Sequence, residues 1–128
     1  MATVNLTEQT FGETVQGSST VFVDFWAAWC GPCRMFAPVY EKVSAAHPDT
    51  VFAKVDTEAE QGLAAAFGIT SIPTLVAIRD GVVLHSQAGA LPEQGLTALI
   101  QAVADVDMDQ VRATIAERAN AEGATAQA

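Results

Sequence analysis

Cys30 and Cys33, the two cysteines of the chain, lie three residues apart in the segment VDFWAAWCGPCRM, residues 23–35. A cysteine thiolate attacks disulfides, and a second thiol close by can resolve the mixed disulfide that results. In a cytosolic chain, two cysteines at this spacing indicate redox chemistry or metal binding rather than a structural crosslink.

The residues around the pair favour a reactive thiolate at Cys30. This residue is expected to precede the first turn of a helix, whose unpaired N–H groups and positive dipole end stabilise a negative sulfur. Gly31 and Pro32 shape a tight turn, and Pro32 gives up an N–H group that the first turn leaves unpaired. We expect Cys30 to face outward as the nucleophile and Cys33 to lie one turn inward as the resolving thiol.

Zinc binding and inert cysteines are the alternatives. Zinc normally takes four ligands. His47 and His85 are the other nitrogen or sulfur candidates, but they belong to different predicted elements and lack zinc-finger spacing. Inert cysteines fit poorly with a pair placed between an apolar strand and a helix.

The hydrophobic pattern predicts an α/β fold with a mixed sheet and helices on both faces. Helices are expected at 6–15, 33–47, 57–68 and 92–104. Strands are expected at 20–27, at 50–56, and in a hairpin over 74–89 that turns at Asp80-Gly81. Thr7 is the expected N-cap of the first helix, and Thr57 with Glu60 the capping box of the third.

Composition narrows the classes of partner. The chain has 128 residues, of which 50% are apolar, which suits one domain with a real core. Its net charge of −9 argues against nucleic acid or an anionic membrane as partner, because both attract basic patches. Residues 1–20 show no signal-peptide pattern and no apolar run is long enough to cross a membrane, so we expect a cytoplasmic protein.

Several motifs resemble those of the thioredoxin family. They are WCGPC at 29–33, Asp24 on the preceding strand, SIPT at 71–74 and AGAL at 88–91. The resemblance extends over roughly residues 4–104 and implies the thioredoxin fold, a central mixed β-sheet flanked by helices.

The resemblance also implies an activity. It implies a protein-disulfide reductase that cycles through a Cys30–Cys33 disulfide, holds no bound cofactor and serves electron transport and cell redox homeostasis. Electrons would come from NADPH through the flavoprotein thioredoxin reductase and pass to varied disulfide-containing proteins. We expect a monomer. An oxidase or isomerase of the same fold and a non-catalytic binding module are the alternatives.

Asp24 is an unusual residue for an apolar strand. A buried carboxylate without a partner tends to hold its proton, and near Cys33 it can take the proton of that thiol directly or through a water. The family assigns this role to the aspartate that Asp24 matches, with Lys54 on the neighbouring strand close to it. The alternative is a structural pair of Asp24 and Lys54.

The substrate-docking surface is also implied by the resemblance. Ile72-Pro73 matches a cis-proline that faces the cysteines, with an ordinary trans proline as the alternative. The Ile72 backbone would pair with an extended substrate strand. Trp29, Gly89 and Ala90 would add an apolar contact surface.

Three parts are expected along the chain: a thioredoxin domain over 1–104, a helical extension over 105–122 and a flexible tail over 123–128. In the extension, Asp107 and Gln110 have the spacing of a capping box. An apolar stripe follows at helical spacing: Met108, Val111 and Ile115. We expect this stripe to pack on its own domain. A helix that docks a partner or forms a dimer, and disorder, are the alternatives.

Overall fold

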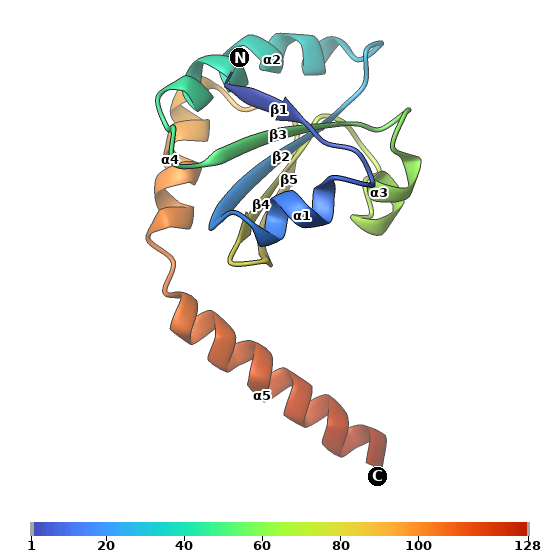
Figure 1. Ribbon diagram of the computed structural model, residues 1–128, viewed down its shortest axis with the longest axis vertical. Coiled ribbons are helices and arrows are strands. Elements are labelled where there is room, and N and C mark those ends of the chain that lie inside the picture. Colours follow the sequence, from blue (N-terminus) through green and yellow to red (C-terminus); the bar gives the residue numbers. More distant parts are fainter. Residues whose placement is uncertain (1, 128) are drawn as a thin grey trace.

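The computed structural model describes the backbone of residues 2–127 and the side chains of residues 2–122. Within this range the elements are β1 (Thr3–Asn5), α1 (Phe11–Gln16), β2 (Thr20–Trp26), α2 (Gly31–Ala45), β3 (Val51–Asp56), α3 (Gln61–Ala66), β4 (Thr74–Arg79), β5 (Val82–Ala88), α4 (Glu93–Ala104) and α5 (Met108–Gln127). They form the predicted mixed sheet with helices on both faces (Figure 1).

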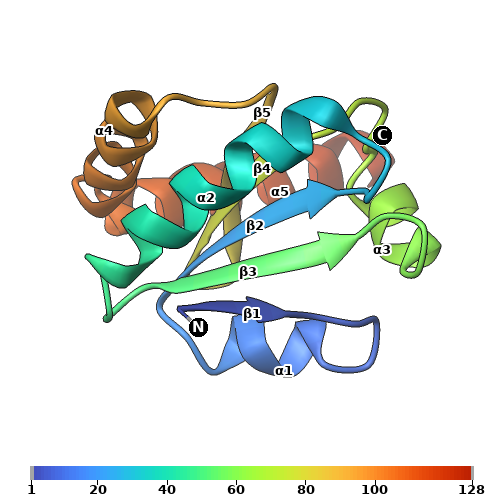
Figure 2. The same ribbon diagram turned by 90° about the horizontal axis from the view of Figure 1, so that it is seen from above.

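The sheet has the strand order β1-β3-β2-β4-β5, with β2 at its centre. β2 runs parallel to β3 and antiparallel to β4, and β4 and β5 form the predicted antiparallel hairpin. Five of its seven residues are buried, because helices cover both faces. The α2 and α4 helices lie on one face, and α1 and α3 lie on the other (Figure 2).

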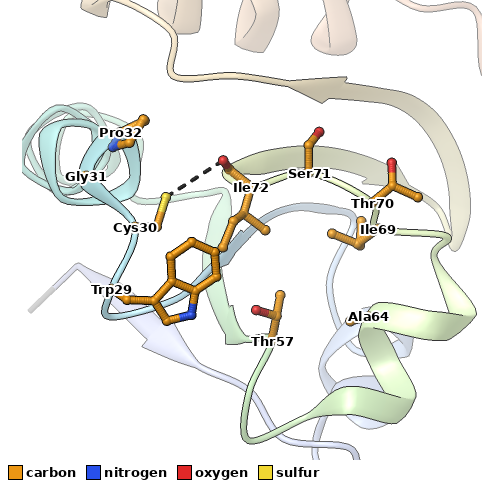
Figure 3. A pocket seen from close by; sticks show the side chains of 10 residues that line it. All are labelled: Trp29, Cys30, Gly31, Pro32, Thr57, Ala64, Ile69, Thr70, Ser71 and Ile72. Carbon is orange, nitrogen blue, oxygen red and sulfur yellow. Dashed lines mark hydrogen bonds between the residues drawn. The ribbon is translucent and has the colours of Figure 1, made fainter.

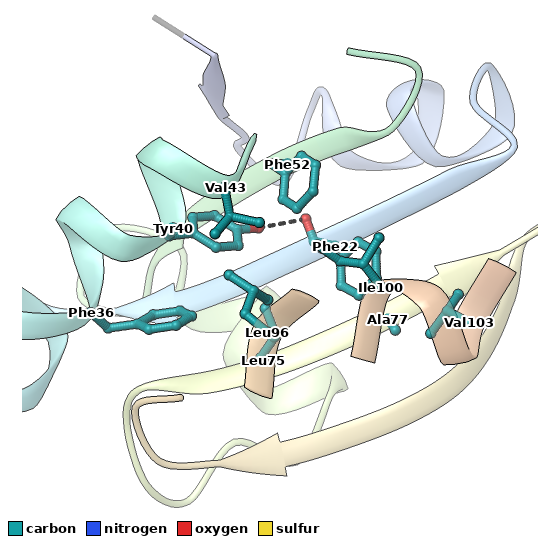
Figure 4. Packing of buried hydrophobic residues seen from close by; sticks show 10 residues of the cluster. All are labelled: Phe22, Phe36, Tyr40, Val43, Phe52, Leu75, Ala77, Leu96, Ile100 and Val103. Atoms are coloured by element: carbon teal, nitrogen blue, oxygen red, sulfur yellow. Dashed lines mark hydrogen bonds between the residues drawn. The ribbon is translucent and has the colours of Figure 1, made fainter. Parts of the chain in front are cut away.

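The core between the sheet and α2 and α4 contains four closely packed aromatic rings, those of Phe22, Phe36, Tyr40 and Phe52 (Figure 4). The Tyr40 ring lies edge-on to Phe52, and the Phe52 ring is stacked on Phe22. The Tyr40 hydroxyl reaches the sheet itself, where it contacts the backbone carbonyls of Phe22 and Ala53. On β2, the side chain two residues beyond Phe22 is on this same face, and that side chain is Asp24.

The β4–β5 hairpin confirms the predicted turn. Asp80 has φ +52° and Gly81 has φ +77°, so both central residues occupy the left-handed region that this two-residue hairpin requires. Three local predictions were wrong: the start of the first helix, its Thr7 cap and the Thr57–Glu60 capping box. The short strand β1, along the sheet edge, was not anticipated.

The first predicted helix begins at Phe11 instead of residue 6. Thr7 does not cap it, because the side chains and backbone of Thr7 and Thr10 bond to each other in the turn before the helix.

The expected Thr57–Glu60 capping box also does not form, and α3 begins only at Gln61. Asp56 Oδ1 instead accepts hydrogen bonds from the backbone N–H groups of Glu58 and Ala59, which closes a turn ahead of the helix. Within residues 2–127, no helix is long and apolar enough to span a membrane.

The C-terminal extension is joined to its own domain near the hairpin turn. Arg79 Nη1 donates to the carbonyl oxygens of Val103, Ala104 and Val106, where α4 ends and the linker to α5 begins. Arg112 of α5 forms an exposed ion pair with Asp80 at 3.4 Å. The domain boundaries remain a prediction.

Beyond the linker, α5 projects from the rest of the molecule (Figure 1). Asp107 Oδ1 accepts a hydrogen bond from the Gln110 N–H, which is one half of the predicted capping box. The apolar stripe is buried only at its start: Met108 is 6% exposed and Ile115 is 46% exposed. The expected flexible tail over 123–128 falls on residues whose side chains lie outside the described part.

These burial differences predict how two substitutions in α5 affect stability. Met108→Ala removes a buried side chain and leaves a cavity, so the free energy of unfolding falls by about 2 kcal/mol. Ile115→Ala is the matched control and costs less than about 1 kcal/mol, because Ile115 is nearly half exposed already. Urea unfolding of the two variants measures both values. Equal losses would contradict an apolar stripe that is buried only at its first residue.

Candidate active site

The cysteine pair lies where the central strand passes into α2. Cys30 is the N-cap of α2, its backbone is extended, and its sulfur accepts a hydrogen bond from the Cys33 N–H at 3.2 Å. Pro32 lies in the first turn, where its missing N–H is not needed. The two cysteines form a disulfide across Cα atoms 5.2 Å apart. In the reduced protein, this N–H group and the helix dipole both favour a thiolate on Cys30.

Exposure does not distinguish the two cysteines, because Cys30 is 4% exposed and Cys33 is 3% exposed. They differ in what they face. Cys30 lines a surface cavity of about 410 Å³, together with Trp29, Gly31 and Pro32 of its own turn (Figure 3), whereas Cys33 is absent from its walls. The cavity therefore gives a substrate disulfide a route to Cys30.

The opposite wall of the cavity comes from the turn between β3 and α3, from α3 and from the segment before β4 (Figure 3). Its residues are Thr57, Ala64, Ile69, Thr70, Ser71 and Ile72. Of these six residues, only Ile72 was expected in the docking surface, because the other five reach the cavity through tertiary packing. The position of residues 69–71 directly before Ile72–Pro73 was the one available signal.

The Ile72–Pro73 peptide bond is cis, as the family resemblance implies. Cys30 Sγ lies 3.7 Å from the Ile72 carbonyl oxygen (Figure 3), to which it can donate only as a reduced thiol. Gly89 has φ +103°, and its N–H donates to the Pro73 carbonyl oxygen at 2.8 Å. Gly89 and the exposed Ala90 thus lie beside Pro73, outside the cavity wall.

Trp29 is the most exposed aromatic residue beside the pair. Its side chain is 67% exposed, and its Nε1–H donates to Glu58 Oε1. Thr57 Oγ1, the preceding side chain, donates to the Trp26 carbonyl oxygen at 3.0 Å. The turn between β3 and α3 is therefore attached to the active-site loop, a role of Glu58 that the sequence did not reveal.

Asp24 is fully buried, and neither carboxylate oxygen has a hydrogen-bond partner among the described residues. Desolvation raises its pKa from an ordinary 3.8 to about 7, against the opposing effect of the Lys54 charge. Lys54 Nζ lies over the Trp26 ring, 4.8 Å from its centroid. The structure therefore does not show the close Asp24–Lys54 ion pair of the structural alternative.

A carboxyl group with this pKa is partly ionised near neutral pH, so it can both accept and return a proton. Among residues 2–127, no group of three or more His, Cys, Asp or Glu side chains is arranged to hold a metal ion.

The pKa of Asp24 makes stability depend on pH. Between pH 4 and pH 7 the folded protein holds a proton at Asp24 that the unfolded chain has released, so the free energy of unfolding falls as pH rises. A shift of this size corresponds to a loss on the order of 4 kcal/mol. Asn does not titrate, so Asp24→Asn is expected to lack this loss.

Guanidinium unfolding of the oxidised protein and of Asp24→Asn at pH 4 and pH 8 measures this difference. On going from pH 4 to pH 8, the free energy of unfolding of the variant is expected to rise by several kcal/mol relative to that of the wild-type chain. Parallel pH profiles would show that Asp24 is not destabilised by burial.

Comparison with known proteins agrees with this geometry. The family model described as Thioredoxin matches residues 2–102. A relative from Streptomyces coelicolor that bears a thioredoxin name is 54% identical over 117 residues, which are 91% of this chain and 87% of that protein. Thioredoxin from Bacillus subtilis is 41% identical over 102 residues, covering 78% of this chain and 96% of that protein.

Solved structures agree as well. A mutant thioredoxin from Halobacterium salinarum superposes with a TM-score of 0.75 at 32% identity, covering 83% of this chain and 95% of that one. Plasmodium falciparum thioredoxin gives a TM-score of 0.72 at 32% identity, covering 77% and 96%. The chain belongs to the thioredoxin family and is a thiol–disulfide oxidoreductase, a protein-disulfide reductase with a redox-active Cys30–Cys33 pair.

Proposed function

We propose that Cys30 is the nucleophile, Cys33 the resolving thiol and Asp24 the proton acceptor of a reductase that acts on varied protein disulfides. The observation that carries this assignment is the cavity, which Cys30 lines and Cys33 does not. Because only Cys30 faces the open side, a substrate disulfide meets Cys30 first.

The reaction proceeds in two exchanges. The Cys30 thiolate attacks one substrate sulfur, a bond forms between them, and the second substrate sulfur leaves as a thiolate that takes up a proton. Cys33 then gives its proton to Asp24 and attacks Cys30 Sγ. The Cys30–Cys33 bond forms, the bond from Cys30 to the substrate breaks, and the first substrate sulfur leaves. The substrate gains two electrons, and the protein is left as the disulfide seen here.

Lys54 assists Asp24 in this scheme by its charge. Its charge lowers the pKa of Asp24 and so opposes the effect of desolvation. It acts without contacting Asp24, since its ammonium group lies over Trp26. With a pKa of about 7, Asp24 is partly ionised near neutral pH, and its ionised form can take a proton.

Substrates would dock across the Ile72–Pro73 segment. Ile72 offers backbone groups to an extended strand, and the exposed Trp29 offers apolar surface beside Cys30. Gly89 and Ala90 would extend this surface past Pro73. Such a surface recognises backbone more than sequence, which suits varied substrates.

The oxidised protein would be reduced again by an NADPH-dependent flavoprotein, thioredoxin reductase. Family membership supports this route and a reducing compartment such as the cytoplasm. No cofactor bound to this chain is needed, because the electrons pass from one dithiol to the next.

The order of attack predicts opposite behaviour of two serine variants toward insulin disulfides. Cys33→Ser lacks the resolving thiol, so it accumulates as a covalent adduct with an insulin chain. Cys30→Ser forms no adduct, because the remaining thiol does not face the cavity. Mass spectrometry after acid quenching counts the adducts. Adduct formation by Cys30→Ser at the rate of Cys33→Ser would reverse the assignment.

The role of Asp24 predicts a change in the pH dependence of resolution. In the wild-type chain the rate at which the mixed disulfide is resolved rises through pH 7, as Asp24 ionises and becomes a proton acceptor. In Asp24→Asn the rate at pH 7 falls by roughly tenfold or more and the inflection disappears. Rapid acid quenching across pH 5–9 measures the profile. An unchanged profile would exclude the role.

A further inference from the structure

Tyr40 is a fully buried side chain with a polar atom in the apolar core between α2 and the sheet. Its hydroxyl lies 3.0 Å from the Phe22 carbonyl oxygen and 2.8 Å from the Ala53 carbonyl oxygen, as a donor to both. Figure 4 shows the ring crossing from α2 to the backbone of β2. A single O–H group thus connects one helix to two adjacent strands.

The residues next to these contacts belong to the exchange site. Phe22 precedes Asp24 by two residues on β2, and Ala53 is followed by Lys54 on β3. Asp24 and Lys54 are direct partners in the β2–β3 register. At the other end of the link, Tyr40 lies seven residues after Cys33, two turns along the same face of α2.

The contact is directional, whereas most of the surrounding contacts are not. The aromatic and aliphatic neighbours of Tyr40 stabilise α2 on the sheet by burial, which is not directional. A hydrogen bond loses strength with small changes in distance and angle. Burial and the nearby Asp24 charge raise the pKa of Tyr40 well above its ordinary value, so the hydroxyl stays a donor.

We propose that Tyr40 is a positioning residue for disulfide exchange: its hydroxyl holds α2, which carries Cys33, at a fixed height above the β2 and β3 segments that carry Asp24 and Lys54. This inference rests on the proposed role of Asp24 as acceptor of the Cys33 proton. Proton transfer depends steeply on the separation of donor and acceptor, so a loosened α2 slows resolution even when the core stays packed.

The test is a double-mutant cycle on the full chain, with insulin as the disulfide substrate. Tyr40→Phe removes only the hydroxyl oxygen and keeps the ring. It is expected to slow resolution of the mixed disulfide about fivefold at pH 7. In the Asp24→Asn background, Tyr40→Phe causes no further loss, because there is no acceptor left to position.

The pH profile gives a second readout that a purely structural role would not change. Loosening admits water to Asp24, whose charged or titratable neighbours are Lys54 on β3 and Tyr40 on α2. The midpoint of the resolution profile therefore moves to lower pH in Tyr40→Phe.

Ser44→Ala is the matched control. Ser44 is another buried hydroxyl on α2, but its Oγ donates to the Glu41 carbonyl oxygen of the same helix at 2.7 Å. This variant also loses a buried hydrogen bond, and it is expected to resolve at the wild-type rate.

The outcomes separate the two proposals. If Asp24→Asn resolves normally, the role of Asp24 fails and the inference falls with it. If Asp24→Asn is slow but Tyr40→Phe is not, only the inference fails. It is also overturned if Tyr40→Phe slows both backgrounds equally, or if Ser44→Ala slows resolution as much.

Discussion

Desolvation of one carboxylate in the centre of the sheet is the constraint on which the rest of this structure depends. Asp24 occupies a strand position that every packing rule reserves for an apolar side chain, and neither oxygen has a hydrogen-bond partner among the described residues. Burying such a residue lowers the free energy of unfolding, and the packing of the surrounding core has to offset that loss. The aromatic rings of α2, β2 and β3 pack against one another in this core and contribute to that stability.

In the active site, two groups a few residues apart have environments with opposite effects on negative charge. At Cys30, the N-terminus of α2 favours a negative sulfur. At Asp24, burial disfavours a negative oxygen, and the Lys54 charge moderates that effect from a distance. The first environment favours the charged form of its group, and the second favours the neutral form, which raises the pKa of Asp24 to about 7. Their environments differ because one lies at an element boundary and the other within a covered strand.

Sequence patterns predicted those parts of the fold whose cause is local. The Asp80-Gly81 turn follows from two residues that tolerate positive φ, and the cysteine pair at the start of a helix follows from its Gly-Pro turn. The start of α3 was missed because Asp56, Thr57 and Glu60 offer competing hydrogen bonds, and only the tertiary setting decides between them. The far wall of the cavity and the Tyr40 link were missed for a related reason. Both join segments that are distant in the chain.

The Arg79 contacts with the end of α4 have a practical consequence for handling the protein. In the β2–β4 register, Arg79 is the partner of Thr20, at the end of the sheet opposite to Phe25 and the active-site loop. The α5 helix leaves from that end and points away from α2 (Figure 1). A dye, bead or surface attached through α5 would therefore leave the dithiol open to solution, so the chain has a built-in spacer for immobilised or single-molecule work.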